Sequence, residues 1–171
     1  MPRKRRTTKA DPLREYVWEE IAGEIAPPDD GRCLCLGEEF ADYLQGRIAF
    51  SPVLERAGSE GPSAPSRPGF ALILGWGVLE SPRAPAVLES VHRALETGGE
   101  ALLFGYCRFP SRDDVVIWER KCREKGLNSA GPLPPPGAVS LSRIAACLAA
   151  GPFEHYSVRK KGIYYLVILR R

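Results

Sequence analysis

Few residues in this chain are of the kinds that perform catalysis or hold metals. The 171 residues include five cysteines and two histidines, and no Cys-x-x-Cys pair occurs. A zinc site needs closely grouped cysteine and histidine ligands, so we expect no metal site. Neither histidine belongs to a triad-like pattern. The cysteines instead predict small buried fillers of a core, in a protein of the reducing cytoplasm.

A few single residues remain candidates for chemistry. Glu80 follows a turn and could act as a general base, although a solvated turn residue is the simpler interpretation. His92 is expected on the surface of a helix, and His155 in a strand far from any ligand. Tyr106 and Cys107 end a predicted strand, where they either face a ligand or pack within the sheet.

Two strands and the helix between them must position these residues. Residues 70–77 are an apolar run broken by glycines, which is typical of a strand buried on both faces. Residues 84–97 carry apolar side chains at helical spacing, and the glycines at 98 and 99 predict the end of that helix. Residues 100–105 are a second apolar run. These lengths predict a right-handed βαβ unit and hence a mostly parallel sheet covered by helices on both faces.

The same stretch resembles the class I S-adenosylmethionine (SAM)-dependent methyltransferases. The resemblance lies in residues 69–74, 78–82 and 87–99. The features that match are the order of the hydrophobic residues, the acid-rich helix and the Gly-Gly pair that ends it. The small-molecule branch related to the ubiquinone and menaquinone methyltransferases is the most similar. The resemblance implies an α/β fold: a Rossmann-like three-layer sandwich whose mostly parallel sheet has one antiparallel strand. The implied strand order is second, first, fourth, fifth, then a C-terminal hairpin.

The resemblance also implies a SAM site, but the first of its motifs is largely lost. In the family the first strand ends in Asp-x-Gly-x-Gly-x-Gly, whose glycines let the backbone approach the methionine part of SAM. Here Cys35 stands at the place of the acid and Gly37 keeps the first glycine. Glu39 and Ala41 replace the next two glycines.

The second motif is altered as well. We expect the second strand at residues 47–52 and a helix from 54, so that Ala49 replaces the acid that binds the ribose in the family. We therefore expect SAM, the only cofactor implied, to bind weakly or not at all. The predicted, degenerate site is lined by Gly37, Glu38, Glu39, Ala49, Phe50, Trp76 and Gly77.

The remaining segments predict one shortened domain over residues 11–171. A helix over residues 11–26 precedes the first strand, and residues 58–68 lack periodicity and leave no room for the family's outer strand. A helix from 110 to 126 should bury Val115, Val116, Trp118 and Cys122. A second helix, capped by Ser140, should bury Leu141, Ile144, Ala145 and Leu148. Strands at 153–159 and 162–170 complete the sheet.

The charge of the chain is concentrated at its start. Residues 1–10 hold five of the 24 basic residues and no acid, which leaves 19 basic against 21 acidic residues elsewhere. We expect residues 1–10 to be a disordered basic arm that contacts nucleic acid weakly and without specificity. No apolar run is long enough to span a membrane, and no secretory signal is recognised.

Three function classes follow from the sequence. The first is a methyltransferase-fold protein with a degenerate SAM site, non-catalytic, that acts through a protein partner or as a homo-oligomer. The second is an active SAM-dependent small-molecule methyltransferase with an atypical cofactor site. The third is a nucleic-acid-associated protein that uses the basic arm. We expect each of them in the cytoplasm and none at a membrane.

Overall fold

The computed structural model describes residues 11–50, 54–58, 69–108, 111–127, 135 and 137–171. Its helices are α1 (Pro12–Ala22), α2 (Glu38–Gln45), the 3-10 helix η1 (Val78–Glu80), α3 (Ala84–Ala94), α4 (Arg112–Glu124) and α5 (Leu141–Ala149). Its strands are β1 (Arg32–Leu36), β2 (Glu55–Ala57), β3 (Phe70–Trp76), β4 (Leu95–Tyr106), β5 (His155–Lys161) and β6 (Tyr164–Arg170).

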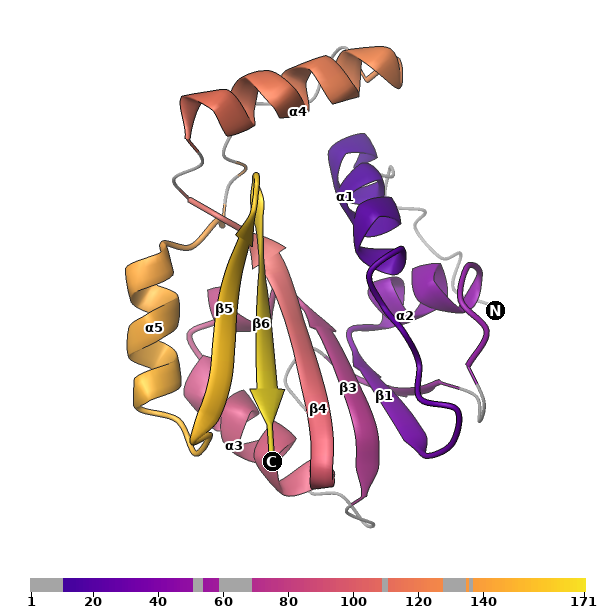
Figure 1. The fold of residues 1–171 in the computed structure, drawn as a ribbon, viewed down its shortest axis with the longest axis vertical. Coiled ribbons are helices and arrows are strands. Elements are labelled where there is room, and N and C mark those ends of the chain that lie inside the picture. Colours follow the sequence, from indigo (N-terminus) through magenta and orange to yellow (C-terminus); the bar gives the residue numbers. More distant parts are fainter. Residues whose placement is uncertain (1–10, 51–53, 59–68, 109–110, 128–134, 136) are drawn as a thin grey trace, which may run out of the picture.

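The described strands form one sheet in the order β2-β1-β3-β4-β6-β5 (Figure 1). The first four of these pair in parallel, and β6 is antiparallel to both of its neighbours. The predicted α/β fold, strand order and single antiparallel strand are confirmed. Among the described residues β2 is the outermost strand on its side, as expected of a sheet without the family's outer strand.

Helices cover both faces of the sheet and give two apolar cores. One core joins α1, α2 and one side of α4 to the sheet, and it contains both Cys33 and Cys35, as predicted. The other core joins α3 and α5 to the opposite face. Each large apolar side chain that is fully buried stabilises the fold by about 1.5–3 kcal/mol, so both cores contribute to its stability. Helix α4 lies across the end of the sheet, beyond the carboxyl end of β4 (Figure 1).

Polar side chains cap the start of three helices, among them the predicted cap at Ser140. The side chain of Asp11 accepts from the Leu13 amide at 3.1 Å, and Ser140 caps α5 in the same way. Ser111 and Asp114 form a reciprocal capping box at the start of α4. The predicted end of the first helix at residue 26 is wrong, because α1 ends at Ala22 and Gly23 caps it.

The prediction of the second strand is wrong. Residues 47–50 form a loop whose Ile48 and Phe50 pack on the core, and the strand begins only at Glu55, within the segment predicted as helix. β2 carries exposed polar side chains, so hydrophobic periodicity could not reveal it. It is held by backbone pairing with β1 and by an ion pair of 2.7 Å between Arg32 and Glu55.

Other predicted boundaries and faces also differ. The helix predicted to reach residue 97 ends at Ala94, because β4 begins at Leu95 with an irregular pairing that contains the positive-φ Gly98. On α4 only Trp118 and Cys122 are fully buried, and Val116 is 55% exposed. On α5 the predicted core residues Leu141 and Ala145 are exposed. The predicted disordered arm and most of the loop at 58–68 lie outside the described residues.

Candidate functional site

The turn between β1 and α2 consists of a single residue. β1 ends at Leu36, Gly37 has a φ of 100°, and α2 begins at Glu38. A φ in this range favours glycine, which explains the residue at this position. The Gly37 amide donates to the carbonyl of Ala57 at 2.8 Å and so fixes the turn against β2. No glycine-rich loop separates strand and helix here.

The two glutamates of the predicted site stand on the first turn of α2. Glu38 and Glu39 are both exposed, and negative charge at a helix N-terminus is favourable. Glu39 forms an ion pair of 3.0 Å with Arg14 of α1. This glutamate therefore ties α2 to α1.

Trp76 and Gly77 of the predicted site lie at the carboxyl end of β3. The Trp76 ring belongs to an aromatic cluster, which consists of Trp18, Phe40, Tyr43, Trp76 and Tyr106. Ring centroids lie 5.0 Å apart between Trp76 and Tyr106 and 5.9 Å apart between Trp76 and Trp18. The aromatic cluster thus joins α1 and α2 to the ends of β3 and β4.

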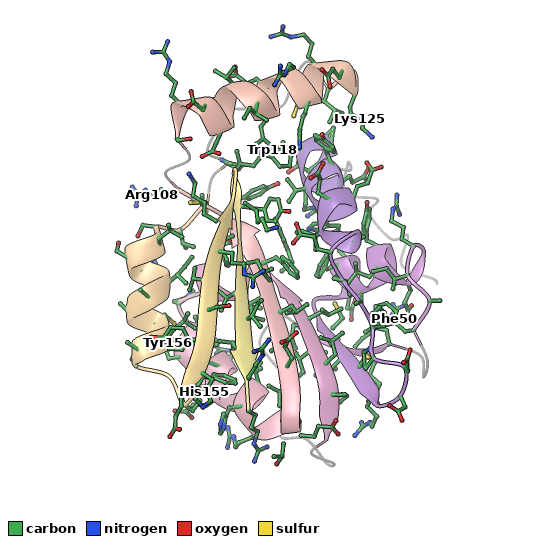
Figure 2. All side chains as sticks on the ribbon, in the orientation of Figure 1. Phe50, Arg108, Trp118, Lys125, His155 and Tyr156 are labelled. Carbon is green, nitrogen blue, oxygen red and sulfur yellow. The ribbon has the colours of Figure 1, made fainter. Side chains whose placement is uncertain are left out.

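Ala49 and Phe50 are not at a strand end. Both lie in the loop before β2, and the labelled Phe50 lies on the α2 side of the molecule, far from α4 (Figure 2). The carboxyl end of β2 is formed by Ala57, followed by Gly58. Neither of these two residues carries a carboxylate. The described end of β2 therefore lacks the acid that binds the ribose in the family, even when the strand is taken at residues 55–57.

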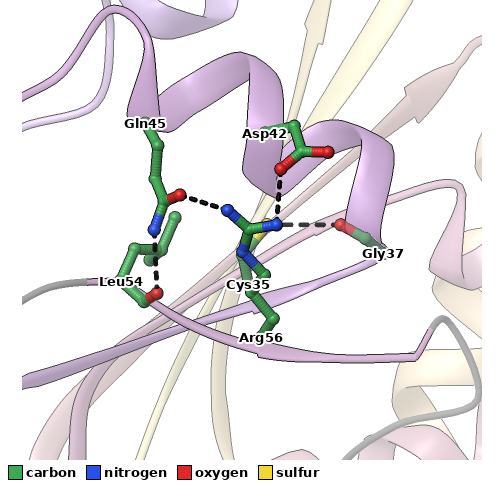
Figure 3. A network of polar contacts seen from close by, with 6 residues as sticks. All are labelled: Cys35, Gly37, Asp42, Gln45, Leu54 and Arg56. Carbon is green, nitrogen blue, oxygen red and sulfur yellow. Dashed lines mark hydrogen bonds and ion pairs between the residues drawn. The ribbon is translucent and has the colours of Figure 1, made fainter.

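The positively charged side chain of Arg56 lies next to this strand end. The guanidinium of Arg56 in β2 pairs with Asp42 and donates to Gln45, both on α2 (Figure 3). Gln45 in turn donates to the Leu54 carbonyl at 3.1 Å. Burial raises the pKa of the neighbouring Cys35 thiol to about 12, so a neutral sulfur occupies the place of the family's acid.

Glu80 is mostly buried, so the expectation of a solvated turn residue is wrong. Its Oε1 accepts from the Tyr106 amide at 3.0 Å and therefore bridges η1 and β4. A side chain at Gly105 would collide with this carboxylate and with the Tyr165 hydroxyl. Burial raises the pKa of Glu80 to about 7, against the opposing effect of the hydrogen bond from Tyr106.

Two residues on α1 were missed by the sequence analysis of the site. Arg14 and Trp18 face the strand ends, and the guanidinium of Arg14 lies 4.8 Å from the centre of the Trp18 ring. Their spacing of four residues places them on one side of the helix, and this was the available signal. The Nε atom of Arg14, the indole N–H of Trp18 and the hydroxyl of Tyr106 are buried without hydrogen-bond partners.

Neither histidine lies near these strand ends. His92 is on α3, in the opposite layer, and its ring lies 5.0 Å from that of Phe153. His155 begins β5 at the end of the sheet remote from Trp118 (Figure 2). Within the described residues no group of three metal-binding side chains occurs. No helix in the same part of the chain is long and apolar enough to cross a membrane.

Helix α4 is fixed over the strand ends by apolar packing of Trp118 and Cys122 and by polar contacts. Tyr16 and Trp118 have ring centroids 5.2 Å apart, and Lys121 of α4 and Lys125 just after it pair with Glu20 and Glu19 of α1 at 3.4 Å. Hydrogen bonds from Lys160 and then Ser111 lower the pKa of Asp114 to about 2. A cavity of about 320 Å³ lies between α4, α1 and the β5–β6 turn, and its lining includes Glu24, Trp118 and Tyr164.

The sheet and its helices match solved methyltransferase structures. A SAM-dependent methyltransferase from Thermotoga maritima aligns with a TM-score of 0.54 at 12% identity, over 92% of this chain and 89% of that one. A protein of Methanococcus maripaludis described as a putative S-adenosyl-L-methionine-dependent methyltransferase aligns with a TM-score of 0.56 at 14% identity, over 94% of this chain and 85% of that one. A protein of Nostoc punctiforme described as a putative O-methyltransferase aligns with a TM-score of 0.56 at 10% identity, over 94% of this chain and 57% of that one.

Comparison of the sequence alone finds less. No family model matches the chain. No curated protein matches it either. Identities of 10–14% carry the fold and no activity.

Proposed function

We propose that this chain, which has the fold of the class I SAM-dependent methyltransferases, has lost productive SAM binding and acts through contacts with a protein partner or a second copy of itself. The observation that carries the proposal is the one-residue turn at Gly37, because a helix that starts at Glu38 leaves no loop to enclose the cofactor. The strand end without a carboxylate at Ala57 and Gly58 supports it.

The expected loss of affinity is large. Each hydrogen bond to a charged group contributes about 1.5–3 kcal/mol, and the missing ribose acid removes two. Affinity should therefore fall by roughly two to four decades relative to an intact site. Calorimetric titration with SAM and with its demethylated product tests this, and a low-micromolar dissociation constant for either would contradict the proposal.

A matched pair of variants sharpens the experiment. Gly58→Asp returns a carboxylate to the end of β2, where an added Cβ atom meets no atom within 4 Å. Ala49→Asp places the same group in the preceding loop and serves as the control. Gly58→Asp should raise the affinity for SAM measurably and Ala49→Asp should not.

The second candidate is an active small-molecule methyltransferase with an atypical cofactor site. It is favoured by the parallel pairing of β1, β3 and β4, because ligands of open α/β sheets bind at the carboxyl ends of such strands. The same titrations separate it from the first candidate. Contact of the basic arm with nucleic acid, and a cytoplasmic location, remain part of the proposal.

A further inference from the structure

Strand β5 is an open edge of the sheet. It is the last strand in the order and pairs with β6, so among the described residues no strand lies along its other side (Figure 1). Every residue of His155–Lys161 is exposed or half-buried. The backbone N–H and C=O groups along such an edge are a template for another extended chain. The occupant that β5 fits is therefore a strand.

The first half of β5 is apolar on the face that α3 and α5 cover. Tyr156 is 43% exposed, and the other exposed large hydrophobic residues of the described chain lie on α4 and α5. Val158 is half-buried against the core of this face. Tyr156 and Val158 lie opposite Leu169 and Val167 of β6, which belong to that core, so both point to the same face. An aromatic and a β-branched side chain stabilise a sheet when a second strand sets them opposite each other.

Charges of opposite sign lie at the two ends of this segment. Glu154 stands directly before β5 and is exposed, whereas Arg159, Lys160 and Lys161 occupy the end of the strand. Lys160 pairs with an aspartate of α4, and its ammonium group has donors left for a second carboxylate. A reversed copy of the same segment would bring its acidic start to this basic end. The edge is thus complementary to itself, as a two-fold interface requires.

One antiparallel register satisfies both patterns. With Ser157 opposite Ser157 of a second copy, Tyr156 faces Val158 on the face of α3 and α5. Glu154 then faces Lys160. Two-fold symmetry repeats both pairs, so the interface contains two aromatic contacts and two ion pairs. The Ser157 hydroxyl takes no part in this pairing.

Other registers match the side chains less well. Centred on Val158 or on Tyr156, the pairing leaves Glu154 opposite an uncharged residue. Centred on Arg159, it sets two guanidinium groups against each other, and like charges directly opposite destabilise a sheet. In the preferred register Arg159 faces His155 instead. A cavity of about 230 Å³ whose lining includes His155 lies beside this part of the strand and gives the arginine side chain room.

We propose that β5 pairs with β5 of a second copy in antiparallel orientation, so that the two sheets become one across a two-fold axis at Ser157. The inference rests on the proposed function, because it assigns a surface to the contact with a second copy. Charged side chains on an edge strand usually prevent such pairing. Here no two of the three cations at the end of β5 meet in the preferred register, so the charges select that register.

Sedimentation velocity of the full chain, from low micromolar to submillimolar concentration, tests for the dimer. A species of twice the 18.8 kDa chain mass should accumulate as concentration rises. Glu154→Lys sets like charges opposite each other twice and should raise the dimer dissociation constant about tenfold or more. Glu119→Lys makes the same change of charge on the exposed side of α4 and should leave it unchanged. A chain that stays monomeric, or equal dissociation constants for the two variants, would overturn the proposal.

Engineered cysteines test the register. The Cα atoms at position 157 of the two copies should lie about 4.5–5.5 Å apart, which suits a disulfide, whereas those at position 159 should lie about 13 Å apart or more. Mild oxidation should therefore cross-link Ser157→Cys and not Arg159→Cys, both at exposed positions. The parent chain, in which four of the five cysteines are buried, gives the background. Equal cross-linking of the two variants, or none in Ser157→Cys, would contradict the register. Neither result depends on the SAM titrations, and tight SAM binding would leave both unchanged.

Discussion

Glu80 is a carboxyl group whose burial should make the stability of the protein depend on pH. Its pKa rises from 4.5 to about 7 in the folded state. Between these values the folded protein binds more protons than the unfolded chain, so the free energy of unfolding falls as pH rises. The two pKa values correspond to a loss of about 3 kcal/mol from pH 4.5 to pH 8. Urea unfolding at pH 5, 6, 7 and 8 measures it.

The variant Glu80→Gln is the control for this pH dependence. Glutamine keeps the acceptor for the Tyr106 amide but does not titrate. Glu55 and Asp114, whose pKa values are lowered, lose their stabilising effect only in more acidic solution. The difference between parent and variant should therefore isolate Glu80, and parallel pH profiles would refute its altered titration.

Gly105 lies directly against the Glu80 carboxylate and has no room for a side chain. Gly105→Ala would drive a methyl group into the Glu80 carboxylate and the Tyr165 hydroxyl, both held within the sheet. Overpacking of this kind costs about 1–3 kcal/mol. Gly58→Ala is the matched control, because nothing lies within 4 Å of its added methyl group. Equal denaturation midpoints for the two variants would show that Glu80 and Tyr165 move aside freely.

Elements with regular apolar patterns were predicted from sequence, and elements held by polar contacts were not. β3 and β6 are buried on both faces and appear as continuous hydrophobic runs. β2 is an edge strand with Glu55 and Arg56 exposed, so nothing in its composition distinguishes it from a loop. Because the second strand was predicted too early in the chain, the ribose-binding position was assigned to Ala49 and not to the end of β2. Burial of Glu80 and convergence of α1 on Tyr106 depend on tertiary packing, which local patterns do not contain.

Helix α4 offers a test of how far its cap determines its stability. Ser111 accepts from the Asp114 amide at 3.1 Å, and the Asp114 carboxylate accepts from the Ser111 amide at 2.8 Å. Only two side chains of α4 are fully buried, so packing compensates little for a lost cap. Ser111→Ala should lower the free energy of unfolding by about 1 kcal/mol, as seen by urea denaturation.

The control for the cap is Ser157→Ala, on the exposed strand β5. It removes the same hydroxyl from a surface position without a helix terminus. We expect no measurable change in the denaturation midpoint. If Ser111→Ala behaved identically, the capping box would contribute nothing to the fold.

At the scale of the whole molecule, the two faces of the sheet differ in what packs on them. One face, with α3 and α5, is an apolar core in which, among the described residues, only the Glu80 region was considered for a site. The other face brings α1, α2 and α4 over the strand ends, where Trp18, Phe40 and Tyr106 belong to one apolar core. On this face the turn between β1 and α2 is the single residue Gly37.

The uneven charge of the whole chain gives the last prediction. Residues 1–10 hold five basic residues, and the rest of the chain has 19 basic against 21 acidic residues. Any binding to duplex DNA should therefore depend on the arm. Five cations release counterions with a log–log salt slope no steeper than about −4.5. Fluorescence anisotropy over a salt series should show weak binding with at most this slope, and deletion of residues 1–10 should abolish it. Arg123→Gln removes one exposed cation from α4 and should leave the affinity nearly unchanged. Tight binding by the truncated chain would instead locate the nucleic-acid surface on the folded domain.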